Sequence, residues 1–177
     1  DYDTFRKHTQ NLQLGHTQRL ACAERHRPAY INQATEAYNN GAMELQMGNN
    51  AAAVENFKTA LTMGEALGDE GADLVANCKK AISSAYLSMA KDLYNAKDFD
   101  GAVTAFQQAK EVAEGYGEAE IAAEAGELIG QTEMLKYNTA GKEAMKAKDY
   151  PTAIANFSKV LEMDPANGGV AIQLGQA

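Results

Sequence analysis

Apolar and polar positions recur along this chain at intervals of about fifty residues. Three strips of seventeen residues align without gaps; their sequences are GAMELQMGNNAAAVENF, AKDLYNAKDFDGAVTAF and GKEAMKAKDYPTAIANF, which end at Phe57, Phe106 and Phe157. An interval of this length holds two helices and two turns, and such internal repetition is typical of stacked helical units. The pattern therefore predicts an all-α chain.

Each strip predicts the end of one helix, a short turn and the start of a second helix. Asn49, Asp98 and Asp149 stand in the turns, where a short polar side chain can cap the incoming helix, and Pro151 suits a first helical turn. We expect long first helices paired with shorter second helices. The long helices are expected at about 70–96 and 118–147, and the short ones at about 50–66 and 100–114.

A small residue precedes each strip's final phenylalanine by four positions, at Ala53, Ala102 and Ala153. Positions four apart share a helix face, so a small site beside a large ring lets two helices approach closely. Glycines at 64–71 and 126–130 predict helix ends and close packing. The aromatic residues that recur at repeat spacing are predicted core residues: Tyr86, Phe99, Phe106, Tyr137, Tyr150 and Phe157.

The strips and their flanks resemble the tetratricopeptide repeat (TPR) family over residues 34–177. The third repeat carries the family pattern at Tyr137, Ala140, Gly141, Ala144, 148–150, Ala153, Phe157, Asp164 and Pro165. The second repeat matches at Tyr86, Ala90, Leu93, Ala102, Phe106 and Ala109, and the first at Gly41, Gly48, Asn49, Ala53, Phe57 and Ala60. The repeats here are about fifteen residues longer than the usual repeat of the family.

This resemblance implies an α-α superhelix, a solenoid of antiparallel helix pairs. Residues 28–177 are expected to form three such pairs and the start of a fourth. Residues 1–27 contain all four arginines and all three histidines, and this shift in composition predicts an N-terminal helical extension or a partial repeat.

In proteins of this family the first helix of each pair lines a concave face that binds peptides. The corresponding peptide-binding residues here are Tyr38, Asn39, Gln46, Ser84, Ser88, Lys91, Tyr94, Asn95, Asn138, Thr139, Lys142 and Lys146. The same face includes Thr35, Ala42, Leu45, Leu87, Leu135 and Met145 and contains no acidic residue. Its amides and hydroxyls could bond an extended peptide backbone, and its lysines favour a partner with an acidic segment. Some members of the family grip the C-terminal carboxylate of chaperones with a set of Lys and Asn side chains. Tyr38 and Ala42 stand at the corresponding positions of the first repeat, so a receptor for chaperone C-terminal carboxylates is disfavoured.

The net charge of −8 and an isoelectric point near 4.9 argue against a nucleic-acid partner. No apolar run approaches the length that membrane insertion needs. Cys22 and Cys78 lack metal-ligand spacing, and His16, Cys22 and His26 do not share one helix face, so we expect no metal site. With no phosphate-binding loop and no nucleophile motif, we expect no cofactor and no enzymatic activity.

These observations favour a non-catalytic protein-interaction scaffold that binds a peptide segment or a partner helix on its concave face. The alternative is a structural, self-associating module of a larger protein, which would form homo-oligomers. The opening DYDTFRK resembles the region just after the export signal in some bacterial envelope proteins, which favours an exported, periplasmic protein over a cytoplasmic one.

Overall fold

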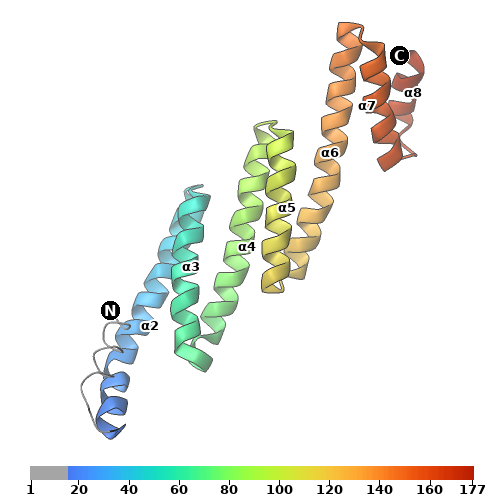
Figure 1. Cartoon of the computed structure of the whole chain (residues 1–177). Helices are drawn as coiled ribbons and strands as arrows, with labels where there is room; N and C mark the ends of the chain where they lie inside the picture. The colour runs from blue at the N-terminus through green and yellow to red at the C-terminus, as the bar shows by residue number, and fades with distance from the viewer. Residues whose placement is uncertain (1–15) are drawn as a thin grey trace. The chain divides into compact units, whose positions relative to one another are not determined.

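The computed structural model describes residues 16–177, with side chains from residue 26 onward, and this part of the chain is helical without any strand. In chain order its elements are α2 (His16–Gln46), α3 (Asn50–Leu67), a 3₁₀ turn η1 (Gly68–Gly71), α4 (Ala72–Asn95), α5 (Phe99–Tyr116), α6 (Ala119–Ala147), α7 (Tyr150–Met163) and α8 (Gly168–Gln176) (Figure 1). The all-α prediction is confirmed. The helices from α3 to α6 begin and end within a few residues of the predicted boundaries.

The chain divides into two compact units, and the boundary between them falls within α4 in the sequence: the first ends at Ala85 and the second is Tyr86–Ala177. Each unit is described separately below. The predicted domain boundary after residue 27 lies inside α2, which continues through Pro28 without ending.

In the first unit α2 and α3 pack along each other. Gly41 allows this close approach, because a Cβ atom at that position would lie 2.7 Å from the Phe57 ring. Tyr38 packs against the same ring, with ring centroids 5.3 Å apart. At the other end of α3, Gly64 lies so close to Gly71 that a side chain at Gly71 would overlap the Gly64 carbonyl, which confirms the predicted close packing over 64–71.

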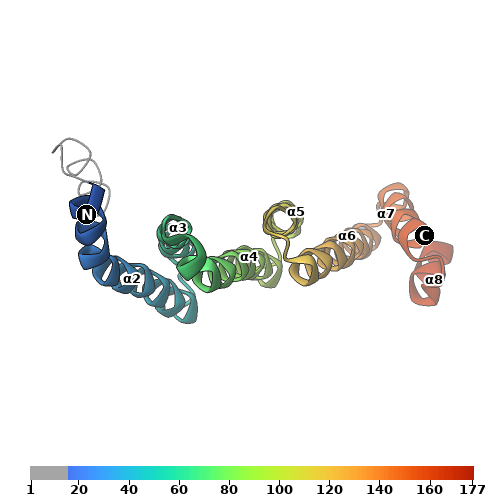
Figure 2. The same cartoon turned by 90° about the horizontal axis from the view of Figure 1, so that it is seen from below.

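In the second unit α6 packs against two partners in succession. α5 lies beside its N-terminal half, α7 lies beside its C-terminal half, and α8 covers α7 (Figures 1 and 2). The contact with α5 includes a cluster around Phe106, the contact with α7 a cluster around Phe157, and both rings are completely buried. We call these the Phe106 cluster (Leu87, Ala90, Ala102, Phe106, Ala109, Ala125) and the Phe157 cluster (Ala144, Ala153, Phe157, Val160, Val170).

The three repeated turns share one backbone geometry. Gly48, Lys97 and Lys148 each adopt a left-handed conformation, with φ values of 79°, 62° and 58°. The predicted caps form at two of the turns: Asp98 accepts a hydrogen bond from the Gly101 amide at 3.0 Å, and Asp149 accepts one from the Thr152 amide at 3.3 Å.

Asn49 does not cap α3. Its side-chain amide instead donates to the Glu44 carboxylate at 2.8 Å, so the cap predicted at the first turn is wrong.

The predicted core is correct at most positions. Ala53, Ala102 and Ala153 are completely buried, as expected for small residues at helix contacts. Tyr150 is an error of the prediction, since 43% of its surface is exposed. As the first residue of α7 it lies at the helix end, outside the Phe157 cluster.

The glycines at 126–130 also differ from the prediction. Gly126 and Gly130 lie in the interior of α6, far from either end of the helix. A Cβ atom at Gly130 would meet nothing within 4 Å, and one at Gly126 would meet only the Lys110 side chain, at 4.0 Å. These two glycines therefore mark neither a helix end nor a close contact.

Candidate functional site

The predicted peptide-binding residues are distributed over both units. Tyr38, Asn39, Gln46 and Ser84 belong to the first unit. The other eight belong to the second unit, on α4 and α6: Ser88, Lys91, Tyr94, Asn95, Asn138, Thr139, Lys142 and Lys146.

A surface cavity of about 390 Å³ brings three of the predicted residues together in the second unit. It lies where the end of α4, the turn into α5 and the middle of α6 meet. We call it the α4–α6 cavity; its lining residues are Tyr94, Asn95, Lys97, Phe99, Leu135 and Thr139. Binding sites of this kind combine apolar walls with a few polar groups that orient the ligand.

The apolar wall of the cavity comes from residues on three helices. The rings of Tyr94 and Phe99 meet edge to face, with centroids 6.2 Å apart. Leu135 of α6 is a lining residue that remains 37% exposed. An exposed leucine beside two aromatic rings forms an apolar surface that a ligand could cover.

A row of four residues on α6 begins in the cavity and continues beyond it. Leu135, Thr139, Lys142 and Lys146 are spaced four, three and four residues apart, so they lie along one side of the helix. At 1.5 Å per residue, Lys142 is about 10 Å and Lys146 about 16 Å along the helix axis from Leu135. The order along this row is therefore apolar, hydroxyl, cation, cation.

The polar side chains of this surface have no partners in the part of the chain whose side chains are described. Among residues 26–177, the side chains of Asn95, Thr139, Lys142 and Lys146 form no hydrogen bond or ion pair. They are available to bond a ligand without breaking an internal contact.

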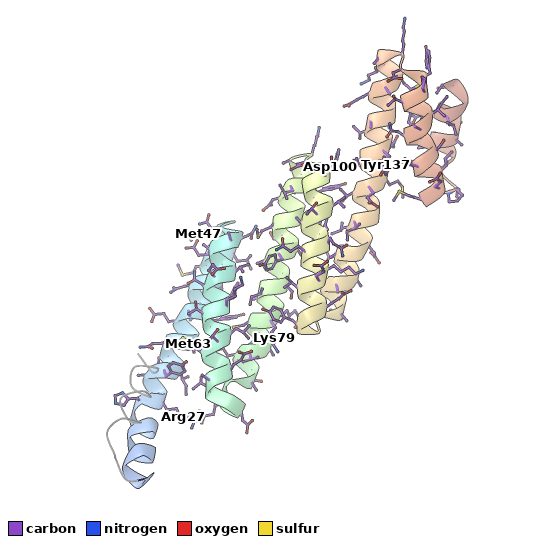
Figure 3. All side chains as sticks on the ribbon, in the orientation of Figure 1. Arg27, Met47, Met63, Lys79, Asp100 and Tyr137 are labelled. Carbon is purple, nitrogen blue, oxygen red and sulfur yellow. The ribbon has the colours of Figure 1, made fainter. Side chains whose placement is uncertain are left out.

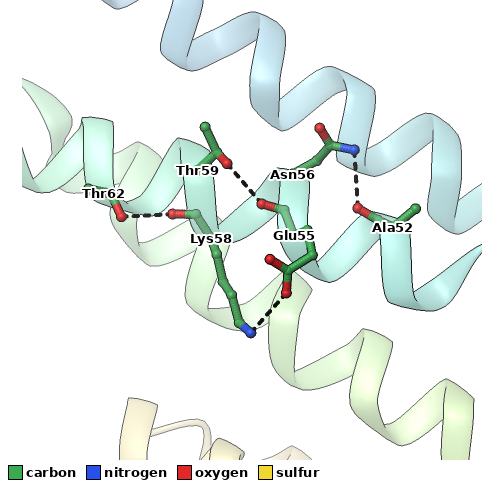
Figure 4. Close-up of polar contacts among 6 residues, drawn as sticks. All are labelled: Ala52, Glu55, Asn56, Lys58, Thr59 and Thr62. Atoms are coloured by element: carbon green, nitrogen blue, oxygen red, sulfur yellow. Dashed lines mark hydrogen bonds and ion pairs between the residues drawn. The ribbon is translucent and has the colours of Figure 1, made fainter.

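The polar side chains on α3 behave differently (Figure 4). Asn56 donates to the Ala52 carbonyl at 3.1 Å, and Thr59 and Thr62 donate to carbonyls one turn earlier at 3.0 Å each. Helical threonines commonly bond back in this way. Thr139 does not, and its hydroxyl is left for another acceptor or donor.

Asn138 occupies an unusual position next to this row. Its Oδ1 atom is shielded from solvent and accepts no hydrogen bond from any described residue. The strip alignment pairs it with Leu87, a core residue, and with Tyr38, which packs on Phe57. A polar side chain therefore stands where the other two repeats have an apolar one.

Lys91 has an internal partner. Its Nζ atom lies 2.6 Å from a carboxylate oxygen of Glu124, an ion pair that links α4 to α6. Its charge is already balanced, so Lys91 supports the helix contact and does not offer the free cation that the sequence suggested.

The acidic residues nearest the cavity are also engaged. Asp98 caps α5, and Asp100 pairs with Lys136, whose pKa is raised by that hydrogen bond (Asp100 is labelled in Figure 3). Lys97, Lys142 and Lys146 have no such partner among the described residues. The cavity rim and the row beyond it therefore present three lysines without an ion-pair partner among the described residues, on a chain that is acidic as a whole.

Sequence reasoning missed Lys97 and misassigned Leu87. Lys97 and Phe99 line the cavity from the turn, which the repeat pattern treats only as a connection. Leu87, expected on the concave face, is 5% exposed and belongs to the Phe106 cluster. Tyr38 makes a core contact with Phe57, so its ring is only partly free for a ligand.

Other candidate chemistry finds little support in the described residues. No group of three or more His, Cys, Asp or Glu side chains there is arranged to hold a metal ion. Burial raises the pKa of the Cys78 thiol to about 11, which disfavours the reactive thiolate at neutral pH. His16 and Cys22, at which no metal site is expected, lie outside the residues whose side chains are described.

None of the described helices is both long enough and apolar enough to cross a membrane.

No family model matches the chain, and no curated protein matches it either. The functional assignment therefore depends on the residues and geometry described above.

Proposed function

We propose that the second unit is a non-catalytic binding module for an extended polypeptide segment, which lies over the α4–α6 cavity and along the α6 row. The observation that supports this most directly is the coincidence of an apolar cavity with unpartnered polar side chains at Asn95, Thr139, Lys142 and Lys146. An extended backbone presents amide and carbonyl groups at regular intervals, which such side chains can bond.

A polypeptide fits this surface better than a compact small molecule. The cavity is at the lower end of the range for small-molecule sites, and the polar row continues about 16 Å beyond Leu135. A ligand that uses both must be long and narrow. A peptide with one side chain in the cavity meets this requirement.

The proposal extends to the fold family. The same contact between a small residue and a phenylalanine ring recurs in all three repeats, which supports a tetratricopeptide-like solenoid. Gly41 lies against the Phe57 ring and Gly141 against the Phe157 ring. In the second repeat Ala90 and Phe106 belong to one buried cluster. In such a superhelix the first helices line the concave face. The α4–α6 cavity would then be part of that face.

Selection from a random peptide library displayed on phage tests the proposed function. The wild-type chain should enrich binding sequences, and Leu135→Asp should reduce recovery of those phage at least tenfold, because a carboxylate would replace the apolar wall. Ile154→Asp is the matched control: Ile154 is 42% exposed, similar to Leu135, but lies on α7 away from the cavity. Equal recovery by wild type and Leu135→Asp, with helix content unchanged in circular dichroism, would contradict the site.

Two further variants address the polar part of the surface. Asn95→Ala and Lys142→Glu should weaken capture of the selected peptides without altering helix content. Full recovery of the peptides by the double variant would count against the polar part of the proposed site.

Light scattering at several concentrations separates peptide binding from self-association, since only a self-associating module predicts a mass that rises with concentration.

A further inference from the structure

Within that proposed function, we infer a specific partner chemistry: an extended segment with one large apolar side chain, followed two and four positions away by acidic residues. This inference rests on the proposed peptide-binding site and assigns the cavity and the two lysines to separate parts of the same ligand.

The apolar anchor follows from the cavity. About 390 Å³ holds one aliphatic or aromatic side chain and the backbone that carries it, and Tyr94, Phe99 and Leu135 present apolar atoms to it. The T-shaped contact between Tyr94 and Phe99 holds both rings in place, so little ordering is needed when a ligand enters. Leucine, isoleucine, methionine or phenylalanine would each gain by leaving water here.

The spacing of the acidic residues follows from the α6 row. The part of α6 that lines the cavity is centred between Leu135 and Thr139, and Lys142 and Lys146 lie about 7.5 Å and 13.5 Å along the helix from that centre. An extended peptide advances about 3.3 Å per residue and its alternate side chains share one face, so positions two and four away from the anchor face α6 with it and reach about 6.6 Å and 13 Å. Carboxylates at those two positions would meet the two ammonium groups in turn.

The charge of the row is available to such a ligand. Glu124, Asp98 and Asp149, on or beside α4 and α6, are already engaged with Lys91, the Gly101 amide and the Thr152 amide. Glu143 adjoins Lys142 in sequence, but successive residues of a helix lie about 100° apart around its axis. It therefore does not lie in line with the row.

Fluorescence anisotropy with synthetic peptides tests the inference on the full chain. The probe is fluorescein-labelled Gly-Ser-Leu-Ser-Glu-Ser-Glu-Ser-Ser-Gly, together with the same residues in reverse order, because whichever of the two binds shows the direction of the chain. Replacing the leucine by serine should weaken binding at least tenfold. Replacing both glutamates by glutamine should weaken it about three- to tenfold, as expected for two exposed ion pairs.

A double-variant comparison assigns the glutamates to their partners. In the Lys142→Gln, Lys146→Gln chain, the glutamate and glutamine peptides should bind equally. The control is Lys80→Gln, an exposed lysine of the first unit, which should preserve the difference. Added salt should reduce the difference in the wild type, because exposed pairs are screened.

The outcomes distinguish this inference from the proposed function. If library selection gives peptides that depend on Leu135 but the glutamate and glutamine probes bind alike, the acidic specificity is wrong and peptide binding stands. If the serine and leucine probes bind alike, the anchor is wrong. If neither the library nor any probe binds, the proposed function fails and this inference fails with it.

Discussion

Two lysines adopt a backbone conformation that side chains with a Cβ atom rarely tolerate. Lys97 and Lys148 have φ near +60°, where the first repeat has Gly48. The left-handed conformation costs a non-glycine residue of order 1–3 kcal/mol, and a positive charge next to a helix C-terminus offsets a part of this strain. The turn geometry is therefore retained even where glycine is absent.

Comparing two substitutions at the same turn isolates this strain. We expect Lys148→Gly to be more stable than Lys148→Ala by about 1 kcal/mol, because both remove the charge and only glycine removes the clash. Urea denaturation followed by circular dichroism measures the difference. Ala147, the last residue of α6, is the control: there alanine should be the more stable residue, and Ala147→Gly should cost up to about 1 kcal/mol. A Lys148→Ala chain as stable as the Lys148→Gly chain would contradict the strain at this turn.

The buried thiol of Cys78 predicts a stability loss at alkaline pH. Its pKa is raised from 9.0 to about 11 in the folded protein by burial. Between these values the unfolded chain loses the proton and the folded chain keeps it, so stability is complete below pH 9 and falls as pH rises towards 11. The expected loss is about 2–3 kcal/mol over that interval.

Urea denaturation between pH 8 and pH 11 measures this effect. Tyrosines and lysines also titrate in that range, so the wild type is compared with Cys78→Ala. The wild type should lose stability more steeply, and parallel curves would show that the thiol does not contribute.

Asn138 shows what residue types alone leave undetermined. The family pattern assigns it to a binding surface, and its amide does lie next to the α6 row, but its Oδ1 atom is shielded from solvent. Burial of one atom depends on the neighbouring helix, which the local sequence does not specify.

Among the elements, α6 contains glycines with opposite roles. Gly141 lies against the Phe157 ring, and a Cβ atom there would be 2.5 Å from a ring carbon. Gly130 lies between the Phe106 and Phe157 clusters along the helix and has no neighbour within 4 Å of such an atom. The same residue type is required at one position and unfavourable at the other.

Alanine substitutions at these two positions should change stability in opposite directions. Gly141→Ala should destabilise the chain by about 1–3 kcal/mol through overpacking against the ring. Gly130→Ala should stabilise it by about 0.5–1 kcal/mol, because alanine favours the helix and meets open space. Thermal unfolding by circular dichroism gives both signs, and a loss of stability in Gly130→Ala would indicate an unrecognised packing role.

Helix lengths were well predicted because the signals for them are local. The turn residues at Asp98 and Asp149 and the glycine at the end of α5, Gly117, mark the boundaries in the sequence itself. The error at Tyr150 has the opposite origin. Its repeat spacing matches that of Phe99, but Phe99 contacts Tyr94, whereas the third repeat has Met145 at the position of Tyr94.

At the scale of the whole molecule, the repeat predicts which residues recur but not which surface remains open. The buried alanines and phenylalanines follow from the fifty-residue pattern, since each sequence repeat forms the same helix contact. The α4–α6 cavity requires Leu135 and Thr139 to lie beside Tyr94, which stands more than forty residues earlier in the chain. This contact, like the ion pair between Lys91 and Glu124, forms only when the helices pack, so the repeat pattern does not predict it.

The length of α6 has a consequence for dissecting the second unit. Its N-terminal half completes the Phe106 cluster and its C-terminal half completes the Phe157 cluster. Removing either α5 or α7 would leave half of this one helix with an uncovered apolar side. Truncation therefore offers no autonomous half-unit, and a minimal soluble fragment must retain α5 to α8 together with the end of α4.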